Sequence, residues 1–149
     1  DTADNPGGGT PGDATHVLRA LIEMGAERAC FGYIFDPDVA RQAHVAGPGA
    51  VIDVRLGGKH DSLHGEPLEL SAYVKTLSDG RFVHTSPMLA GVRAKYGPMA
   101  RLQVGPNRGI DVLVGSARSQ VFDAEVFALH GIDVTRYDLA SGGRRLRWR

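Results

Sequence analysis

Helical and strand-like spacings alternate along the first third of the chain. Apolar residues between positions 17 and 24 recur mostly at intervals of three and four, which predicts an amphipathic helix with Asp13 as its N-cap. Residues 28–35 are almost continuously apolar or aromatic, and such a run is typical of a buried strand. Asp36 stands directly before a proline, a pair that favours the start of a second helix, which is expected to reach about Ala46.

After residue 50 the pattern becomes strand-like. Residues 51–56 alternate between the two faces of a predicted strand, and a Gly-Gly pair ends it. The ranges 68–77 and 81–85 flank a Ser-Asp-Gly turn, and the ranges 100–104 and 110–114 flank a glycine-containing turn. Each of these two pairs is therefore expected to form a β-hairpin.

The order of these elements indicates the fold class. A last, short helix is expected from Asp123 to about His130. Early alternation of helices and strands, followed by hairpins, predicts a mixed α/β fold with much antiparallel sheet, in a single domain over residues 1–138. Residues 139–149 include four arginines and no acidic residue, and we expect them to form a disordered basic tail.

Composition narrows the classes of partner. The 17 Lys and Arg residues balance the 17 Asp and Glu residues, which argues against a nucleic-acid partner and against an anionic membrane surface. No apolar run approaches the roughly 20 residues that span a bilayer, and no apolar leader is visible, so we expect a cytoplasmic protein. The single cysteine, Cys30, excludes an internal disulfide and a zinc site built from cysteines, and its apolar neighbours indicate a core residue rather than a nucleophile.

The densest chemical signal is the glycine-rich opening, Asp-Thr-Ala-Asp-Asn-Pro-Gly-Gly-Gly-Thr-Pro-Gly-Asp. Three successive glycines, Gly7–Gly9, allow a tight turn whose backbone N–H groups can approach a ligand, and the segment leads into a helix start, which favours an anion. Phosphate, a substrate carboxylate or a developing oxyanion would each suit such a loop. The alternative is a loop without a ligand, in which Asp4, Asn5 and Asp13 make local turn and capping bonds.

This opening motif resembles the beginning of the C-terminal domain of MlrC-type metallopeptidases. The resemblance continues in order to about residue 138, through a series of shorter motifs. These are Leu18-Arg19-Ala20-Leu21, Asp36-Pro37, Leu56-Gly57-Gly58-Lys59, Gly65-x-Pro67-Leu68, Leu77-Ser78-Asp79-Gly80-Arg81-Phe82, Ser116-x-Arg118-x-Gln120-x-Phe122-Asp123 and Gly131-Ile132-Asp133. Beyond this point, relatives continue with a Lys-Ser-x-x-His-Phe-like segment where this chain has its basic tail.

The resemblance implies one part of a bacterial hydrolase that is built from two parts. The amino-terminal half of such an enzyme would carry the zinc ligands and most of the catalysis, and would hydrolyse peptide bonds in small or linearised peptides. This chain would be the carboxyl-terminal half, which packs against the other half, completes the active-site cleft and is inactive alone. Zinc is therefore expected in the full-length enzyme, with no metal on this chain, and the expected partners are the catalytic half and a peptide substrate.

Particular residues are then expected to face the cleft. Asp4 and Asn5 would orient a zinc ligand or a substrate amide that the other half positions. Gly7–Gly9 and Lys59 would bind substrate, the lysine because an ammonium group on a Gly-Gly turn can hold a carboxylate, either an aspartate of the chain or a peptide terminus. Arg118 is a further substrate-binding candidate, although its position also suits a side chain that simply faces water.

Histidine spacing offers one possible metal motif. His60 and His64 form a His-x-x-x-His pattern with Asp61 and Glu66 nearby. Glycines and a proline on both sides predict a loop at this place, so the two rings do not share the face of a helix. We therefore expect solvated loop histidines here rather than a zinc site.

Two other classes of function stay open. The chain could be a stand-alone module that binds an anionic small molecule in its glycine-rich loop. It could also be a purely structural domain that completes a fold or an oligomer interface. The peptidase and structural hypotheses both require association with a zinc-bearing partner half, whereas the binding module does not.

Overall fold

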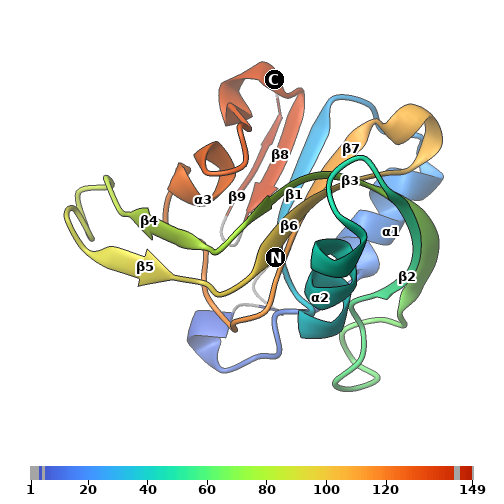
Figure 1. Ribbon diagram of the computed structural model, residues 1–149, viewed down its shortest axis with the longest axis horizontal. Helices are drawn as coiled ribbons and strands as arrows, with labels where there is room; N and C mark the ends of the chain where they lie inside the picture. The colour runs from blue at the N-terminus through green and yellow to red at the C-terminus, as the bar shows by residue number, and fades with distance from the viewer. Residues whose placement is uncertain (1–3, 5, 143–144, 149) are drawn as a thin grey trace.

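A mixed β-sheet forms the centre of the molecule (Figure 1). The structure, a computed structural model, describes residue 4, residues 6–142 and residues 145–148. In spatial order, the seven strands of the sheet are β2 (Val51–Leu56), β3 (Leu68–Ser78), β6 (Met99–Val104), β7 (Ile110–Gly115), β1 (Ala29–Phe35), β8 (Leu139–Gly142) and β9 (Arg145–Trp148). Strand β1 runs parallel to both of its neighbours, β7 and β8, and the other neighbouring pairs are antiparallel.

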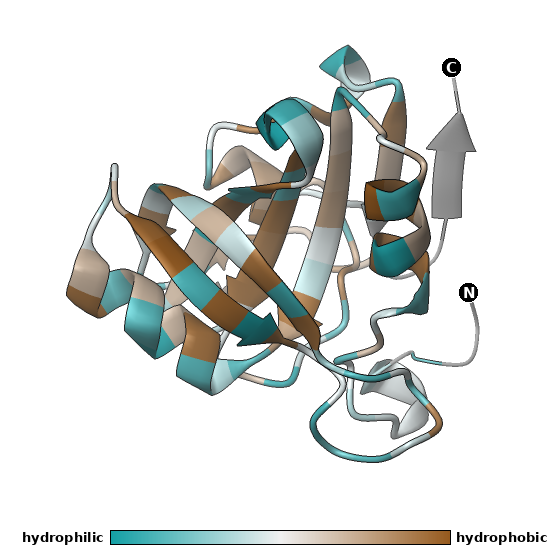
Figure 2. Cartoon of the chain, turned by 90° about the vertical axis from the view of Figure 1, so that its right-hand side faces the viewer, coloured by the Kyte–Doolittle hydropathy of each residue, from teal (hydrophilic) through white to brown (hydrophobic). Residues whose placement is uncertain are grey.

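Helices cover both faces of this sheet. The helical segments are α1 (His16–Glu23), α2 (Pro37–Ala46) and α3 (Glu125–Ala128), with the short 3-10 turns η1 (Pro6–Gly8), η2 (Pro106–Arg108) and η3 (Val134–Arg136). Side chains of the central strands alternate between the two faces of the sheet and so contribute to two hydrophobic clusters. Phe31 and Val112 pack in the cluster that contains α1 and α2, whereas Cys30 and Leu113 pack in the cluster that contains α3. Figure 2 shows the strands in the middle of the molecule as mainly hydrophobic. Across the described residues, no helix is both long and apolar enough to cross a bilayer.

The predicted mixed α/β class is confirmed, and so are most of the early elements. Strand β1 and helix α2 occupy their predicted positions, and Asp36 caps α2 by accepting a hydrogen bond from the backbone N–H of Val39 at 3.1 Å. Helix α1 begins at His16 with Thr15 as its N-cap residue, so the prediction of Asp13 as the cap is wrong. The carboxylate of Asp13 instead accepts hydrogen bonds from the loop that follows β2.

One of the two predicted hairpins is confirmed and the other is wrong. Strands β6 and β7 pair with each other as predicted. Strand β3 does not pair with β4 (Arg81–Val83), which pairs with β5 (Arg93–Lys95) in a separate two-stranded arm. The reason is that β2 and β6 already occupy both edges of β3. At the base of the arm Gly80 has a φ of +69° and lies against the backbone of Gly97, where a side chain would collide.

The last part of the chain also differs from expectation. Helix α3 is shorter than the predicted helix, and its N-cap residue is Ala124, so the prediction of Asp123 as the cap is wrong. One carboxylate oxygen of Asp123 instead lies 2.8 Å from Nδ1 of His84. Within residues 139–149, where we expect a basic tail, β8 pairs with the edge of β1, and β9 pairs with β8. Leu139 in β8 is buried. Residues 143, 144 and 149 of the expected tail lie outside the described residues.

Candidate functional site

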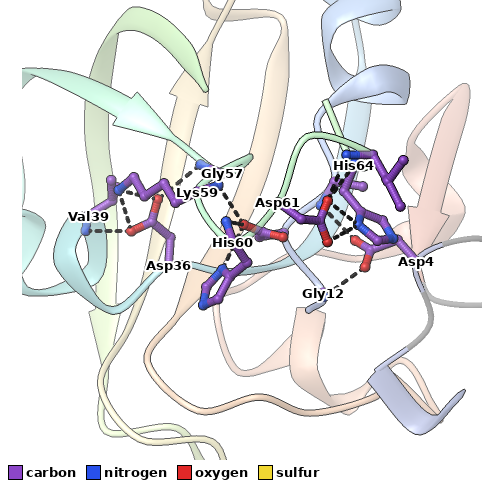
Figure 3. A network of polar contacts seen from close by, with 12 residues as sticks. Asp4, Gly12, Asp36, Val39, Gly57, Lys59, His60, Asp61 and His64 are labelled. Carbon is purple, nitrogen blue, oxygen red and sulfur yellow. Dashed lines mark hydrogen bonds and ion pairs between the residues drawn. The ribbon is translucent and has the colours of Figure 1, made fainter. Parts of the chain in front are cut away.

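The glycine-rich segment forms a closed loop at the carboxyl end of β1, and Asp4 closes it. One carboxylate oxygen of Asp4 accepts a hydrogen bond from Gly12 N at 2.7 Å, and the other accepts one from Ala14 N at 2.6 Å (Figure 3). The carbonyl oxygen of Gly12 in turn accepts a hydrogen bond from Phe35 N at 2.8 Å, which attaches the loop to the end of the strand. Asp4 is therefore a clamp on backbone N–H groups. Asn5, the other predicted supporting residue, lies outside the described residues.

The three predicted substrate-binding glycines form the exposed outer edge of this loop. Gly7, Gly8 and Gly9 are all exposed, within and just after the turn η1. Among the described residues, a Cβ atom at Gly8 would meet no other atom within 4 Å, and its φ lies outside the left-handed region, so packing against this part of the chain does not require glycine there. Gly9 differs because its φ of +92° strains any other residue.

The β2–β3 loop, residues 57–67, is fastened to the segment before α1 by several hydrogen bonds. The backbone of Asp13 accepts a bond from Gly58 N at 2.7 Å, and Thr15 N donates to the carbonyl oxygen of His64 at 2.9 Å. Thr15 also donates its hydroxyl proton to the carbonyl oxygen of Glu66 at 2.8 Å. Two segments that are far apart in the sequence thus form one rigid unit beside the glycine-rich loop.

Lys59 holds a carboxylate, and that carboxylate belongs to the chain. Its Nζ lies 2.8 Å from the carboxylate of Asp36, which is buried and also accepts a hydrogen bond from Gly57 N at 3.0 Å (Figure 3). The Lys59 side chain keeps 30% of its surface exposed. Of the two carboxylates that the sequence suggested, an aspartate of the chain or a peptide terminus, the structure therefore supplies the first.

Each histidine of the His-x-x-x-His motif is paired with its own aspartate. His60 Nδ1 lies 2.9 Å from Asp13 Oδ2, and His64 Nδ1 lies 2.7 Å from Asp61 Oδ2 (Figure 3). The hydrogen bond from His64 lowers the pKa of Asp61. In the part of the chain that the structure describes, no three His, Cys, Asp or Glu side chains come together as a metal site.

Two further features of the site were not predicted. The other oxygen of Asp13, Oδ1, is buried and has no hydrogen-bond partner among the described residues. The guanidinium of Arg118 lies 5.4 Å from the ring centroid of Phe35, whose ring also lies 5.5 Å from that of His60. The exposed Arg118 therefore lies over the Phe35 ring, beside the Asp13–His60 pair. This position is consistent with either expected role, substrate binding or simple exposure to water.

A cavity of about 320 Å³ opens between the glycine-rich loop and the carboxyl half of β1. Asp4 and Pro6 line it from the loop, and Tyr33 and Ile34 from the strand, with Val121 on a third side. The Tyr33 hydroxyl donates a hydrogen bond to the carbonyl oxygen of Ala117, and burial raises the pKa of this tyrosine. Apolar and polar residues both line the cavity, as they do in binding sites for organic ligands. No sequence motif indicated it, because its walls come from segments that are distant in the chain.

Comparisons with known proteins agree with the sequence motifs. Residues 1–140 match the family described as MlrC C-terminus. Microcystinase C of Sphingomonas sp. is 30% identical over 133 residues, which are 89% of this chain and 25% of that protein. A crystal structure from Mesorhizobium sp. BNC1, described as that of a candidate metallopeptidase, superposes with a TM-score of 0.82 at 26% identity, over 95% of this chain and 28% of that one. The chain therefore spans about a quarter of the length of both relatives.

Proposed function

Because the chain belongs to the MlrC C-terminus family, we propose that it is the carboxyl-terminal domain of a metallopeptidase that hydrolyses peptide bonds in small or linearised peptides. It forms one wall of an active-site cleft, and the amino-terminal part of the longer polypeptide supplies the other wall and the catalytic zinc. The description of the Mesorhizobium structure as a metallopeptidase supports this proposal. So does the fraction of each relative, about a quarter, that the chain spans. The bacterial origin and the cytoplasmic location belong to the same proposal.

The observation that carries the proposal is the geometry of the glycine-rich loop. Asp4 clamps the two ends of the loop, and the exposed Gly7–Gly9 edge stands beside the cavity without a packing partner that requires glycine at position 8. A rigid loop that presents bare backbone suits the close approach of a peptide or of an opposing protein surface. We assign Gly7–Gly9 to substrate contact and Asp4 to the positioning of the loop.

The other assigned residues act around this loop. Lys59, through Asp36, fixes the β2–β3 loop beside the cleft, and because its side chain is 30% exposed we assign it a contact with a substrate carboxylate. Arg118, which lies over the ring of Phe35, is a second cationic group that binds an anionic part of the substrate. We also assign Asn5, next to Asp4 in the sequence, to orienting a zinc ligand or a substrate amide. This assignment rests on the family resemblance alone.

The donor groups described in this chain do not make up a zinc site. A catalytic zinc takes three protein ligands, from His, Asp, Glu or Cys. Here three His–Asp pairs lie apart from one another, His60 with Asp13, His64 with Asp61 and His84 with Asp123, and no group of three such side chains comes together among the described residues. The metal ligands therefore belong to the amino-terminal part, and we expect the chain alone to lack peptidase activity.

Substitution of Gly8 tests the role of the loop. In the full-length metallopeptidase that contains this domain, Gly8→Val adds a branched side chain to the exposed loop edge, where the chain itself leaves room for it. We expect kcat/KM for a small peptide to fall by about 100-fold, because reacting groups that are misplaced by about an ångström lose that much rate. Thermal unfolding should stay unchanged. The matched control is Ala46→Val, at an exposed position on α2 away from the loop.

The outcome separates the competing functions. Wild-type turnover in the Gly8→Val enzyme would contradict the catalytic role of the loop and favour a structural domain, in which Asp4 and Lys59 serve only their intramolecular bonds. If the variant unfolded at a lower temperature and lost activity in proportion, the loop would likewise be structural. A loss of turnover at normal stability, absent in Ala46→Val, supports the proposal.

A further inference from the structure

A second cavity, of about 500 Å³, lies at the opposite end of the parallel strands. Its walls come from residues near the amino ends of β1, β7 and β8, from Arg101 and Gln103 of β6, and from the segment between α3 and β8. The proposed peptidase cleft lies at the carboxyl end of β1, so the two cavities do not share a lining residue. Four arginines line the second cavity: Arg28, Arg101, Arg108 and Arg136. We call it the arginine pocket.

Arg101 and Asp111 form its floor. Nε and Nη2 of Arg101 lie 2.7 and 3.0 Å from the two oxygens of Asp111, and both side chains are mostly buried, at 12% and 7% exposure. Nη1 of Arg101 donates to the carbonyl oxygen of His130 at 3.1 Å, and the Tyr137 hydroxyl donates to Asp111 at 2.6 Å. Burial lowers the pKa of Arg101, but the hydrogen bonds and charge of Asp111 outweigh it, so the net pKa is raised. This floor is rigid, and its charge is internally balanced.

At the rim, the three arginines Arg28, Arg108 and Arg136 outnumber the two carboxylates of Asp133 and Asp138. Arg28 pairs with Asp138 at 2.9 Å, and both of these side chains are exposed. Arg108 and Arg136 are also exposed, and neither has a carboxylate partner in the described part of the chain. The guanidinium of Arg108 lies 4.3 Å from the ring centroid of Tyr73, so its face is stacked while its N–H edge stays available.

The backbone also holds two of these arginines in place. Arg28 and Arg108 have φ values of +51° and +55°, in the left-handed region that non-glycine residues seldom adopt. Asn107, directly before Arg108, has the same conformation, and these three are the non-glycine residues with positive φ in the described chain. Such backbone conformations are maintained at an energetic cost and gather at functional sites.

We propose that the arginine pocket binds a small oxyanion with two negative charges, such as a phosphate group or a dicarboxylate, between Arg108 and Arg136. Guanidinium groups recognise such anions through paired N–H···O bonds. We assign Arg101 to the floor and not to direct contact with the anion, because four of its five N–H groups already donate to Asp111, His130 and Tyr137. This site is separate from the proposed peptide cleft and does not depend on the peptidase assignment.

Calorimetric titration of the 149-residue chain tests the proposal. Inorganic phosphate and succinate are added in separate experiments at pH 7.5, with sodium chloride adjusted to keep the ionic strength constant. We expect saturable binding of one anion per chain by at least one of the two probes, and their relative affinities identify the preferred source of the charge. Arg136→Gln, which removes no contact within the described chain, should weaken binding by about tenfold or more, because a hydrogen bond to a charged group has that value.

Two comparisons keep the result decisive. Arg41→Gln is the control, because Arg41 is an exposed arginine on α2 that pairs with Asp38 away from the pocket. Arg136→Lys retains the charge but not the planar fork, so its affinity should fall between those of the wild type and Arg136→Gln. The proposal is wrong if neither probe saturates. It is also wrong if Arg41→Gln weakens binding as much as Arg136→Gln does, which would indicate general electrostatic attraction.

Discussion

The two ends of the parallel strands use charged side chains in opposite ways. At the carboxyl end of β1, the carboxylates of Asp4, Asp13 and Asp36 bond to backbone N–H groups and to Lys59 and His60, with only Oδ1 of Asp13 lacking a partner among the described residues. The exposed surface beside these carboxylates is the glycine backbone of Gly7–Gly9. At the amino end, the buried Arg101–Asp111 pair forms a fixed floor, and the exposed Arg108 and Arg136 at the rim have no carboxylate partner among the described residues. One end therefore presents backbone, and the other presents guanidinium groups.

This difference has a structural cause. Helix α2 begins directly after the carboxyl end of β1, and the segment that leads into α1 is bonded to the same end. Carboxylates there therefore meet backbone N–H groups that need acceptors. The amino ends of β1, β7 and β8 are reached through turns, and the side chains of these turns project around the strand ends. Exposed glycine backbone at the carboxyl end suits close contact with another part of the protein. Guanidinium groups around a cavity at the amino end suit a small anionic ligand.

The largest effect is expected from breaking the floor of the arginine pocket. Asp111→Ala leaves the guanidinium of Arg101 mostly buried without its carboxylate, so we expect the free energy of unfolding to fall by about 3–5 kcal/mol. Urea denaturation of the chain measures this loss. Asp138→Ala is the matched control, because its partner Arg28 is 65% exposed and the pair is worth only about 0–1 kcal/mol. Equal losses in the two variants would show that the floor is not rigid.

A smaller, pH-dependent effect is expected at His130, which lies behind the same floor. Its ring is buried between the hydroxyl groups of Thr76 and Ser78, and burial together with the charge of Arg101 lowers its pKa from 6.5 to about 4. Between these two pH values the unfolded chain binds more protons at His130 than the native chain. Stability is therefore complete above pH 6.5 and decreases as the pH falls toward 4, by on the order of 2–3 kcal/mol.

Denaturation at a series of pH values checks this prediction. His130→Gln should retain a hydrogen-bonding side chain, lower the stability at pH 7 and remove most of the dependence between pH 6.5 and 4. A wild-type chain that is equally stable at both ends of this range would contradict the buried neutral histidine. Such a result would also weaken the description of the amino end as the rigid one.

Local chemistry could be predicted from the sequence, and long-range assembly could not. The Asp-Pro start of α2 identified Asp36 as a cap, because a cap depends on the next three residues alone. The same carboxylate also accepts hydrogen bonds from Gly57 and Lys59. These bonds could not be predicted, because they depend on how β2 packs beside α2. The glycine-rich loop was recognisable as a motif, but its clamp was not, since Asp4 bonds to residues eight and ten positions away.

The arginine pocket shows the same limit more strongly. Arg28 and Arg136 are far apart in sequence and meet only because β8 pairs in parallel with β1, where a disordered tail was expected. The failed prediction of a β3–β4 hairpin has a similar origin, because strand pairing depends on which sheet edges other strands already occupy. Turn residues such as Asp79-Gly80 indicate that the chain turns, and they do not indicate the sheet in which it continues.

The smallest effect on stability, and the sharpest test of the carboxyl end, is expected at Asp4. Asp4→Asn keeps one oxygen acceptor and sets an amide NH₂ against the other backbone N–H, so it should cost about 1–2 kcal/mol of unfolding free energy. In the full-length metallopeptidase, turnover should fall by about 10–100-fold, as expected when a positioning carboxylate is lost. Asp38→Asn, at an exposed ion pair on α2, is the control for both measurements. If Asp4→Asn lowered stability by this amount and left turnover at the wild-type value, the clamp would shape the loop without serving the cleft, and the two ends of the strands would differ in architecture only.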